Sequence, residues 1–171
     1  PRRVPQKVFE VPVRGAMLAS PAVHENGTIF VGSGTGLTGI TPSGEVLFQL
    51  RIGAVTATPS ITPEGHVLAQ AAHTPLVVRV DPSGAVLEQL RMRMGGHGSP
   101  LVLPDGSFVL TALDQSLQRF DGTGSLMFRA ALPGVATSDV ALTEADELVV
   151  AAGAELLYFS SRGELRSRTS V

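Results

Sequence analysis

The chain has 171 residues, of which 43% are hydrophobic and 16% are charged, and its formal net charge is −2. This composition excludes a disordered chain, and the charge gives no electrostatic reason to expect nucleic acid or an anionic membrane as a partner. No apolar run approaches the roughly 18 residues that a membrane-spanning helix needs, and the absence of cysteine excludes disulfide and thiolate chemistry.

The chain opens with a loose segment, residues 1–7, followed by an apolar stretch whose pattern is found again further along. Residues 8–21 resemble residues 47–59, where an apolar run leads into a Thr-Pro pair. We therefore predict a leading strand over residues 8–13, equivalent to the last strand of a repeating unit.

The repeating unit begins at a Ser-Pro or Thr-Pro pair and contains four short apolar runs separated by turns. In three units the first two runs are separated by Asn-Gly, Glu-Gly or Asp-Gly, and glycine there supplies the positive φ angles of tight hairpins. The last unit has Glu-Ala-Asp instead. The predicted units cover about residues 19–51, 57–91, 98–130 and 137–168.

A second turn marks the period most regularly. Its closing glycine is found at positions 44, 84, 124 and 163, so the intervals are 40, 40 and 39 residues. An apolar run precedes each of these turns, and another follows most of them. Self-similarity at about 40 residues is typical of proteins built from stacked or radially arranged units.

This pattern predicts one all-β domain over residues 1–171, a β-propeller-like fold of four consecutive four-stranded antiparallel blades. Helix is disfavoured because no segment sustains apolar residues at helical spacing, and glycine or proline interrupts most windows. One such sheet cannot bury both of its faces alone, so neighbouring sheets must pack face to face. We expect an arc of a larger propeller, completed by further chain or by a second copy; a small closed ring of four blades is the alternative.

The landmarks of the unit resemble the repeats of the quinoprotein-type, or PQQ-like, β-propeller family. The family pattern runs from Ser-Pro through a small apolar strand, Asp-Gly, a strand ending in Gly-Ser, another strand and Thr-Gly to a docking tryptophan four residues on. The first unit matches it at Ser20–Val23, Asn26–Ser33 and Ser43–Gly44, and the third at Ser99–Pro100, Asp105–Gly106 and Thr123–Gly124. The likeness covers nearly the whole chain from Val8.

The sequence departs from the family pattern at the docking position, because it contains no tryptophan. The docking positions hold Phe48, Glu88, Phe128 and Ser167, of which the phenylalanines are best suited to fill a slot between blades. Catalytic members of the family stack pyrroloquinoline quinone on a tryptophan beneath adjacent cysteines, with calcium nearby, and this chain has neither residue type. The resemblance therefore implies the non-catalytic branch, no cofactor, and a periplasmic or extracellular location.

Blades arranged around an axis form a disc with two faces. The blade pattern places the loops near residues 73 and 114, and the connection around residues 91–97, on one of these faces, which we call the loop face. The candidate partner-binding residues on the loop face are His73, Arg93, Met94, His97 and Asp114. Methionine and arginine are typical of protein interfaces. His73 and His97 lie in neighbouring loops, and histidines near a carboxylate are able to bind a metal or transfer protons. Because no short fixed spacing marks a metal site, none is assigned.

We therefore predict a non-enzymatic scaffold or interaction module that binds a protein or peptide through the loop face. Self-association, most simply as a dimer, is expected because exposed blade faces and strand edges favour it. No catalytic nucleophile or acid–base pair is recognisable, since the serines lie mostly in turn positions and the carboxylates are scattered singly.

Two enzymatic alternatives stay open. One is a fragment of a quinoprotein-type, PQQ-dependent oxidoreductase whose cofactor site lies in missing blades. The other is a metal-dependent lyase or hydrolase that uses His73 and His97.

Overall fold

The computed structural model describes residues 6–136 and 138–170, and these residues form sixteen β-strands and no helix. The strands group into four antiparallel sheets of four strands, and within each sheet the strands lie in chain order. Among the described residues, no helix is long and apolar enough to cross a membrane.

The four sheets coincide with the four glycine-marked units. The first sheet contains β1 (Ala22–Val23), β2 (Ile29–Ser33), β3 (Gly36–Ile40) and β4 (Val46–Leu50). The second contains β5 (Ser60–Ile61), β6 (Val67–Gln70), β7 (Leu76–Val80) and β8 (Val86–Arg91). The third contains β9 (Leu101–Val102), β10 (Phe108–Ala112), β11 (Ser116–Phe120) and β12 (Leu126–Ala131). The fourth contains β13 (Ala141–Leu142), β14 (Leu148–Ala152), β15 (Glu155–Phe159) and β16 (Leu165–Ser170).

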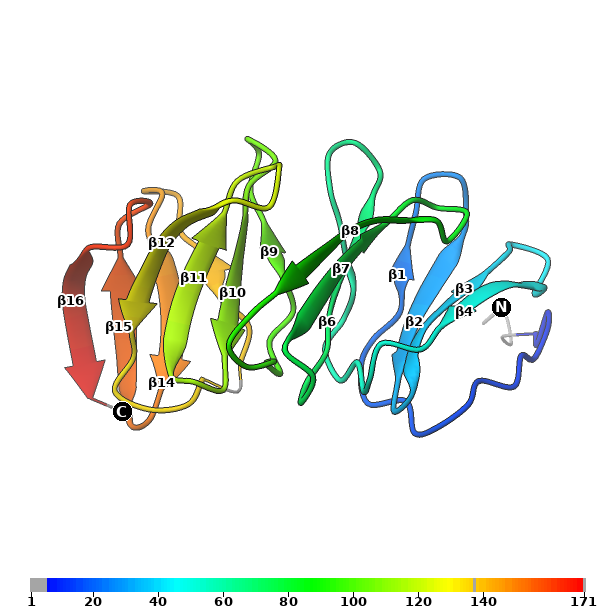
Figure 1. Ribbon diagram of the computed structural model, residues 1–171, viewed down its shortest axis with the longest axis horizontal. Coiled ribbons are helices and arrows are strands. Elements are labelled where there is room, and N and C mark those ends of the chain that lie inside the picture. Colours follow the sequence, from blue (N-terminus) through cyan, green and yellow to red (C-terminus); the bar gives the residue numbers. More distant parts are fainter. Residues whose placement is uncertain (1–5, 137, 171) are drawn as a thin grey trace, which may run out of the picture.

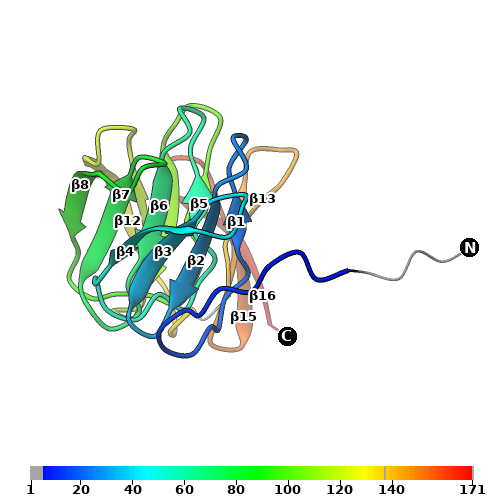
Figure 2. The same cartoon turned by 90° about the vertical axis from the view of Figure 1, so that its right-hand side faces the viewer.

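The sheets stand side by side in an open row, with the first and fourth sheets at opposite ends (Figure 1). Viewed along the row, they lie one behind another, each facing the next (Figure 2). The predicted fold class, four consecutive four-stranded antiparallel blades, is confirmed. The open row corresponds to the expected arc and not to a closed ring of four blades.

The closing turn of each unit has the same backbone geometry. The glycines at positions 44, 84, 124 and 163 have φ between +78° and +95°. The N–H of each donates to the carbonyl oxygen three residues earlier at 2.9–3.0 Å. In the hairpin where the last unit lacks glycine, Asp146 takes a φ of +59° and its N–H donates to the Thr143 carbonyl at 3.1 Å. Aspartate is one of the few residues that tolerate this left-handed conformation, so the hairpin is kept.

Three apolar cores form between the four sheets. The first core includes Phe30, Leu37, Val67 and Val78; the second includes Leu68, Val77, Phe108 and Leu110; the third includes Val109, Leu117, Leu148 and Phe159. The adjacent residues Val77 and Val78 on β7 are both fully buried, yet they belong to different cores. Successive side chains of a strand point to opposite faces, so the inner sheets need continuous apolar runs instead of alternation.

The closing glycines are covered by side chains from the preceding unit. A Cβ atom at Gly84 would overlap the ring of Phe48, and one at Gly163 would overlap the ring of Phe128. At Gly124 the covering atoms come from Glu88 and Leu90. The residues at these three docking positions therefore do contact the turn of the next unit, although one of them is not aromatic.

The Ser-Pro and Thr-Pro pairs hold the sheets together near the short first strands. The N–H of Thr58 donates to the Ser99 hydroxyl at 3.2 Å, and the N–H of Ser99 donates to a carboxylate oxygen of Asp139 at 2.6 Å. The Ser60 hydroxyl donates to the Pro100 carbonyl. The opening residues of each unit thus form a seam of hydrogen bonds that joins the second, third and fourth sheets.

Residues 8–13, for which the sequence predicts a leading strand, belong to none of the four sheets. With residues 17–21, they enclose an apolar groove against Ile29, Val31 and Ile40 on the face of the first sheet that the second sheet does not cover. Phe9 contacts Gly44 as Phe48 contacts Gly84. The segment therefore occupies the docking position of a preceding unit, and it pairs with none of the strands that the structure describes.

Replacement of Gly84 by alanine tests the docking contact. We expect Gly84→Ala to lower the free energy of unfolding by about 1–2 kcal/mol or more, because the new Cβ meets both a positive φ and the Phe48 ring. Gly122→Ala is the matched control, since its Cβ would lie no closer than 3.6 Å to any heavy atom beyond its chain neighbours, and we expect a change within about 0.5 kcal/mol. Urea unfolding measures both variants, and equal midpoints would contradict the docking role.

Candidate interaction site on the loop face

The five candidate residues lie at one end of the second and third sheets. His73 is in the turn between β6 and β7, and Asp114 is in the turn between β10 and β11. Arg93, Met94 and His97 are in the connection between β8 and β9. Because adjacent strands of these sheets run in opposite directions, the two turns and the connection reach the same end.

His73 and His97 are in contact, although they are separated by a whole strand pair in the sequence. Their ring centroids are 5.2 Å apart and the ring planes are inclined at 79°. His97 is half-buried, and its Nδ1 lies 3.0 Å from the Thr56 hydroxyl oxygen. His73 is exposed. The Thr56 hydroxyl thus orients the His97 ring, and the edge-to-face contact brings the two imidazoles together at the surface.

The connection that carries Arg93 and Met94 is held by its buried glycines. The Gly95 carbonyl accepts a hydrogen bond from the N–H of Leu113 at 2.8 Å, and the N–H of Gly96 donates to the Ala71 carbonyl at 3.2 Å. A Cβ at either glycine would overlap a backbone carbonyl oxygen of a neighbouring turn or strand. Only glycine therefore allows the connection to pack this closely against the turns on both sides.

The two residues before these glycines are open to solvent. Met94 is 45% exposed, and Arg93 is also exposed. A large apolar side chain and a guanidinium group therefore lie at the surface of a segment that is fixed by backbone hydrogen bonds.

Asp114 has a different environment from the other four candidates. One of its carboxylate oxygens is 2.8 Å from Arg129 Nη2, and the other accepts a hydrogen bond from the Ser116 hydroxyl. Its side chain is only 13% exposed. Asp114 therefore positions Arg129, a residue that the sequence did not single out, and is not itself an open contact group.

No three His, Cys, Asp or Glu side chains within residues 6–136 and 138–170 lie together in an arrangement that could hold a metal ion. Within these residues the histidine pair is therefore not part of a metal-binding cluster, and Asp114 is paired with Arg129 instead.

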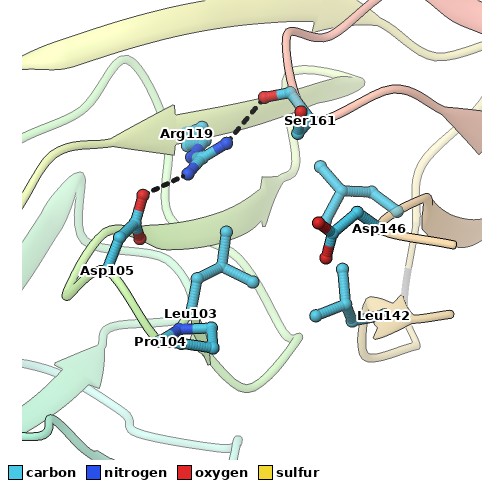
Figure 3. Close-up of a pocket in the computed structure, with 8 residues that line it drawn as sticks. Leu103, Pro104, Asp105, Arg119, Leu142, Asp146 and Ser161 are labelled. Atoms are coloured by element: carbon cyan, nitrogen blue, oxygen red, sulfur yellow. Dashed lines mark hydrogen bonds and ion pairs between the residues drawn. The ribbon is translucent and has the colours of Figure 1, made fainter. Parts of the chain in front are cut away.

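A second polar site lies between the third and fourth units, at the end of the strands opposite to the loop face. Figure 3 shows its residues in close-up. Arg119, only 8% exposed, donates from Nε to the Ser107 hydroxyl at 3.0 Å, from Nη1 to the Ser161 carbonyl at 2.7 Å, and from Nη2 to Asp105 at 2.7 Å. A cavity of about 280 Å³ lies beside it, lined also by Leu103 and Leu142. Because all three guanidinium nitrogens are engaged, Arg119 acts as a clamp between two sheets.

The sequence contains a repeated signal for this clamp. Arg79 occupies the equivalent position 40 residues earlier, and its Nη1 donates to the Gly122 carbonyl of the next unit. The repeated arginine marks a structural contact between units.

Three aspartates in turns have pKa values below their usual range. A hydrogen bond from the Ser83 hydroxyl is the main cause of the lowered pKa of Asp81, and the Thr123 hydroxyl has the same effect on the pKa of Asp121. The pKa of Asp105 is lowered mainly by the Ser107 hydroxyl and less strongly by the charge of Arg119. In each case the ionised carboxylate accepts the hydrogen bonds that hold its turn.

No family model matches this sequence, and no curated protein matches it. Similar solved structures include a streptogramin B lyase (TM-score 0.71, 11% identity) and a catalytically inactive virginiamycin B lyase from Staphylococcus aureus with quinupristin (0.75, 14%). A third is the C-terminal WD40 domain of Sif2 (0.72, 15%). The matches cover 88%, 95% and 90% of this chain but 53%, 58% and 46% of the other chains, so this chain spans about half their length. At these identities the likeness shows the fold alone, and that fold is β-propeller-like.

The lowered pKa values predict acid sensitivity. The folded protein keeps these carboxylates ionised at pH values where the unfolded chain takes up protons, so their stabilisation is present above the ordinary carboxyl pKa of about 4 and is lost as the pH falls through the lowered folded values. The triple variant Asp81→Asn, Asp105→Asn, Asp121→Asn keeps an acceptor oxygen in each turn but removes the titration. We expect the loss of unfolding free energy between about pH 7 and about pH 3 to be smaller in this variant than in the wild type. An equal loss, measured by urea unfolding at both pH values, would contradict this assignment.

Proposed function

We propose that this chain is a β-propeller interaction module that binds a protein or peptide segment through the loop face. The observation that carries the proposal is the connection between β8 and β9, in which exposed Arg93 and Met94 precede glycines that are held by backbone hydrogen bonds. A segment that is already ordered loses little conformational entropy on binding, so more of the contact energy contributes to affinity.

The chemistry of these side chains supports a macromolecular partner. Methionine adapts its shape to an apolar surface, and arginine donates several hydrogen bonds in a fixed plane. The His73–His97 pair lies on the same face and adds aromatic surface next to the connection. Surfaces enriched in methionine, arginine and aromatic rings are characteristic of protein interfaces.

The likeness to non-catalytic quinoprotein-type repeats belongs to this proposal. It is supported by Phe48 and Phe128, which cover the closing glycine of the next unit at the position where the family has its docking tryptophan. Glu88 departs from that pattern, because a carboxylate takes the place of the ring.

A peptide selection experiment tests binding at the loop face. Peptides selected from a random display library on the wild-type protein should bind at least about tenfold more weakly to Arg93→Ala, Met94→Ala, because both side chains are lost from the contact surface. The matched control is Arg166→Ala, an exposed arginine on β16 in the fourth sheet, and it should bind like the wild type. Selected peptides that bind both variants equally would contradict the loop-face site.

Self-association forms the second part of the proposal. Val149, Leu156 and Tyr158 belong to the face of the fourth sheet turned away from the third, because their strand neighbours Leu148, Leu157 and Phe159 lie in the third core. The three side chains are only partly buried, and no described sheet covers them. In the other sheets the equivalent face is buried against the next sheet, which a second copy would provide here.

Sedimentation equilibrium at high micromolar concentration tests this association. We expect a dimer for the wild type and a shift toward monomer for Leu156→Asp, because a carboxylate cannot be buried in an apolar interface without a partner. The control Leu87→Asp changes a residue that is 49% exposed on the outer strand of the second sheet, and it should leave the dimer intact. A wild type that stays monomeric would contradict the proposal.

A histidine-dependent lyase is a second candidate function, favoured by the contact between His73 and His97. Two of the similar solved structures are lyases, and the catalytically inactive one has a histidine replaced by alanine. The Thr56 hydroxyl holds the His97 ring in place, and an imidazole positioned in this way is suited to proton transfer.

Incubation with quinupristin, with and without magnesium, tests this second candidate by chromatography of the small molecule. Conversion by the wild type that is lost in His73→Ala, His97→Ala would support a lyase. No conversion under either condition, or equal conversion by the double variant, would contradict a quinupristin lyase that uses this histidine pair.

A further inference from the structure

A groove of about 380 Å³ runs along the outer side of the junction between the second and third sheets. Its walls are apolar and come from the end of β8 and from the strands β11 and β12. They are formed by Leu90, Met92, Phe120 and Leu126. Leu126 is 53% exposed, so the groove opens to solvent along β12. This volume is sufficient for a short peptide segment with one or two side chains.

The groove lies at the junction where the docking position holds Glu88 and not an aromatic residue. At the two flanking junctions Phe48 and Phe128 cover the closing glycine, whereas here Glu88 and Leu90 cover Gly124. Glu88 is 25% exposed and pairs with Arg79 at 3.4 Å, and its carboxylate is not an apolar filler. The docking position at this junction therefore holds a charged group next to a leucine side chain, where the neighbouring junctions hold an aromatic ring.

The rim of the groove is positively charged. Arg91, Arg93 and Arg129 line it. Arg129 is paired with Asp114, and Glu88 is paired with Arg79. Within residues 6–136 and 138–170 neither Arg91 nor Arg93 forms an ion pair, and both are exposed. Two guanidinium charges are thus left without a carboxylate partner beside an apolar groove.

An open strand edge borders the same groove. In the second sheet, β8 pairs with β7 on one side and with no other described strand (Figure 1). The outer backbone groups of β8 can therefore accept an extended chain by strand addition. Backbone pairing, apolar walls and free guanidinium groups together match a peptide better than a small molecule.

From these observations we infer that the groove binds an extended acidic peptide, with an apolar side chain between the β8 and β12 walls and flanking carboxylates on Arg91 and Arg93. This rests on the proposed function and names the chemical class of its partner. A nucleic acid fits the site less well, because its phosphates would need a continuing basic path and this groove offers only two unpaired arginines beside apolar walls.

Fluorescence anisotropy with short synthetic peptides tests this inference. The first peptide contains leucines flanked by aspartates and glutamates; the second has lysines in place of the acidic residues; the third has alanines in place of the leucines. We expect only the first to bind well, and we expect its affinity to fall at least about tenfold in Arg91→Gln, Arg93→Gln and further in Arg91→Glu, Arg93→Glu. Arg166→Glu, Arg168→Glu on β16 changes the net charge as much as the second variant and is the matched control, which should bind like the wild type.

The outcomes separate this inference from the proposed function. If the acidic probe does not bind and the peptides selected on the loop face are not acidic, the inference is overturned. The proposed function as an interaction module would then still stand. Equal binding of the acidic probe to the groove variants and the control would overturn the inference as well. A short oligothymidylate that binds more tightly than the acidic peptide, and loses binding in the Arg91 and Arg93 variants, would replace the peptide by single-stranded nucleic acid. Circular dichroism confirms that each variant is folded before its binding is compared.

Discussion

The packing of sheet against sheet is the interaction on which the whole structure depends. Each unit is a small sheet whose two middle strands have apolar residues on both faces, so it cannot shelter them by itself. Three apolar cores between four sheets solve this problem, and adjacent residues such as Val77 and Val78 serve different cores. Stability is therefore distributed over the junctions between units. As in other repeat proteins, the total stability is approximately a sum of contributions from single units and from the interfaces between neighbours.

The junctions share a plan but differ in their chemistry, and the differences coincide with the candidate sites. Phe48 and Phe128 close two junctions with aromatic rings, whereas at the middle junction Gly124 is covered by Leu90 and by Glu88, which pairs with Arg79 of its own sheet. The basic groove and the connection that carries Arg93 and Met94 both lie at this middle junction. Positions at which one unit departs from the repeat pattern are good candidates for functional sites.

The fold could be predicted from the sequence because it follows from local features that recur at a constant period. Closing glycines at intervals of 39–40 residues, together with the Ser-Pro or Thr-Pro pairs that open three of the units, are sufficient to place all four sheets. The same register predicts that His73 and His97 lie in neighbouring loops, and the contact between their rings is an observation of the structure. The engagement of Asp114 by Arg129, and the absence of partner strands for residues 8–13, depend on which side chains meet across sheets. Periodicity specifies where a residue lies along the unit, but not the distant group that neutralises or pairs with it.

The first strand of every unit is only two residues long, and its neighbours across the junction are reached mainly by single hydrogen bonds such as those among Thr58, Ser99 and Asp139. Near the first strands the sheets are thus joined at a few points, whereas their middle strands are joined by broad apolar contact. Such an assembly tolerates small changes in the angle between neighbouring sheets without breaking the hydrogen bonds between paired strands. The same unit design is consequently compatible with arcs of different curvature.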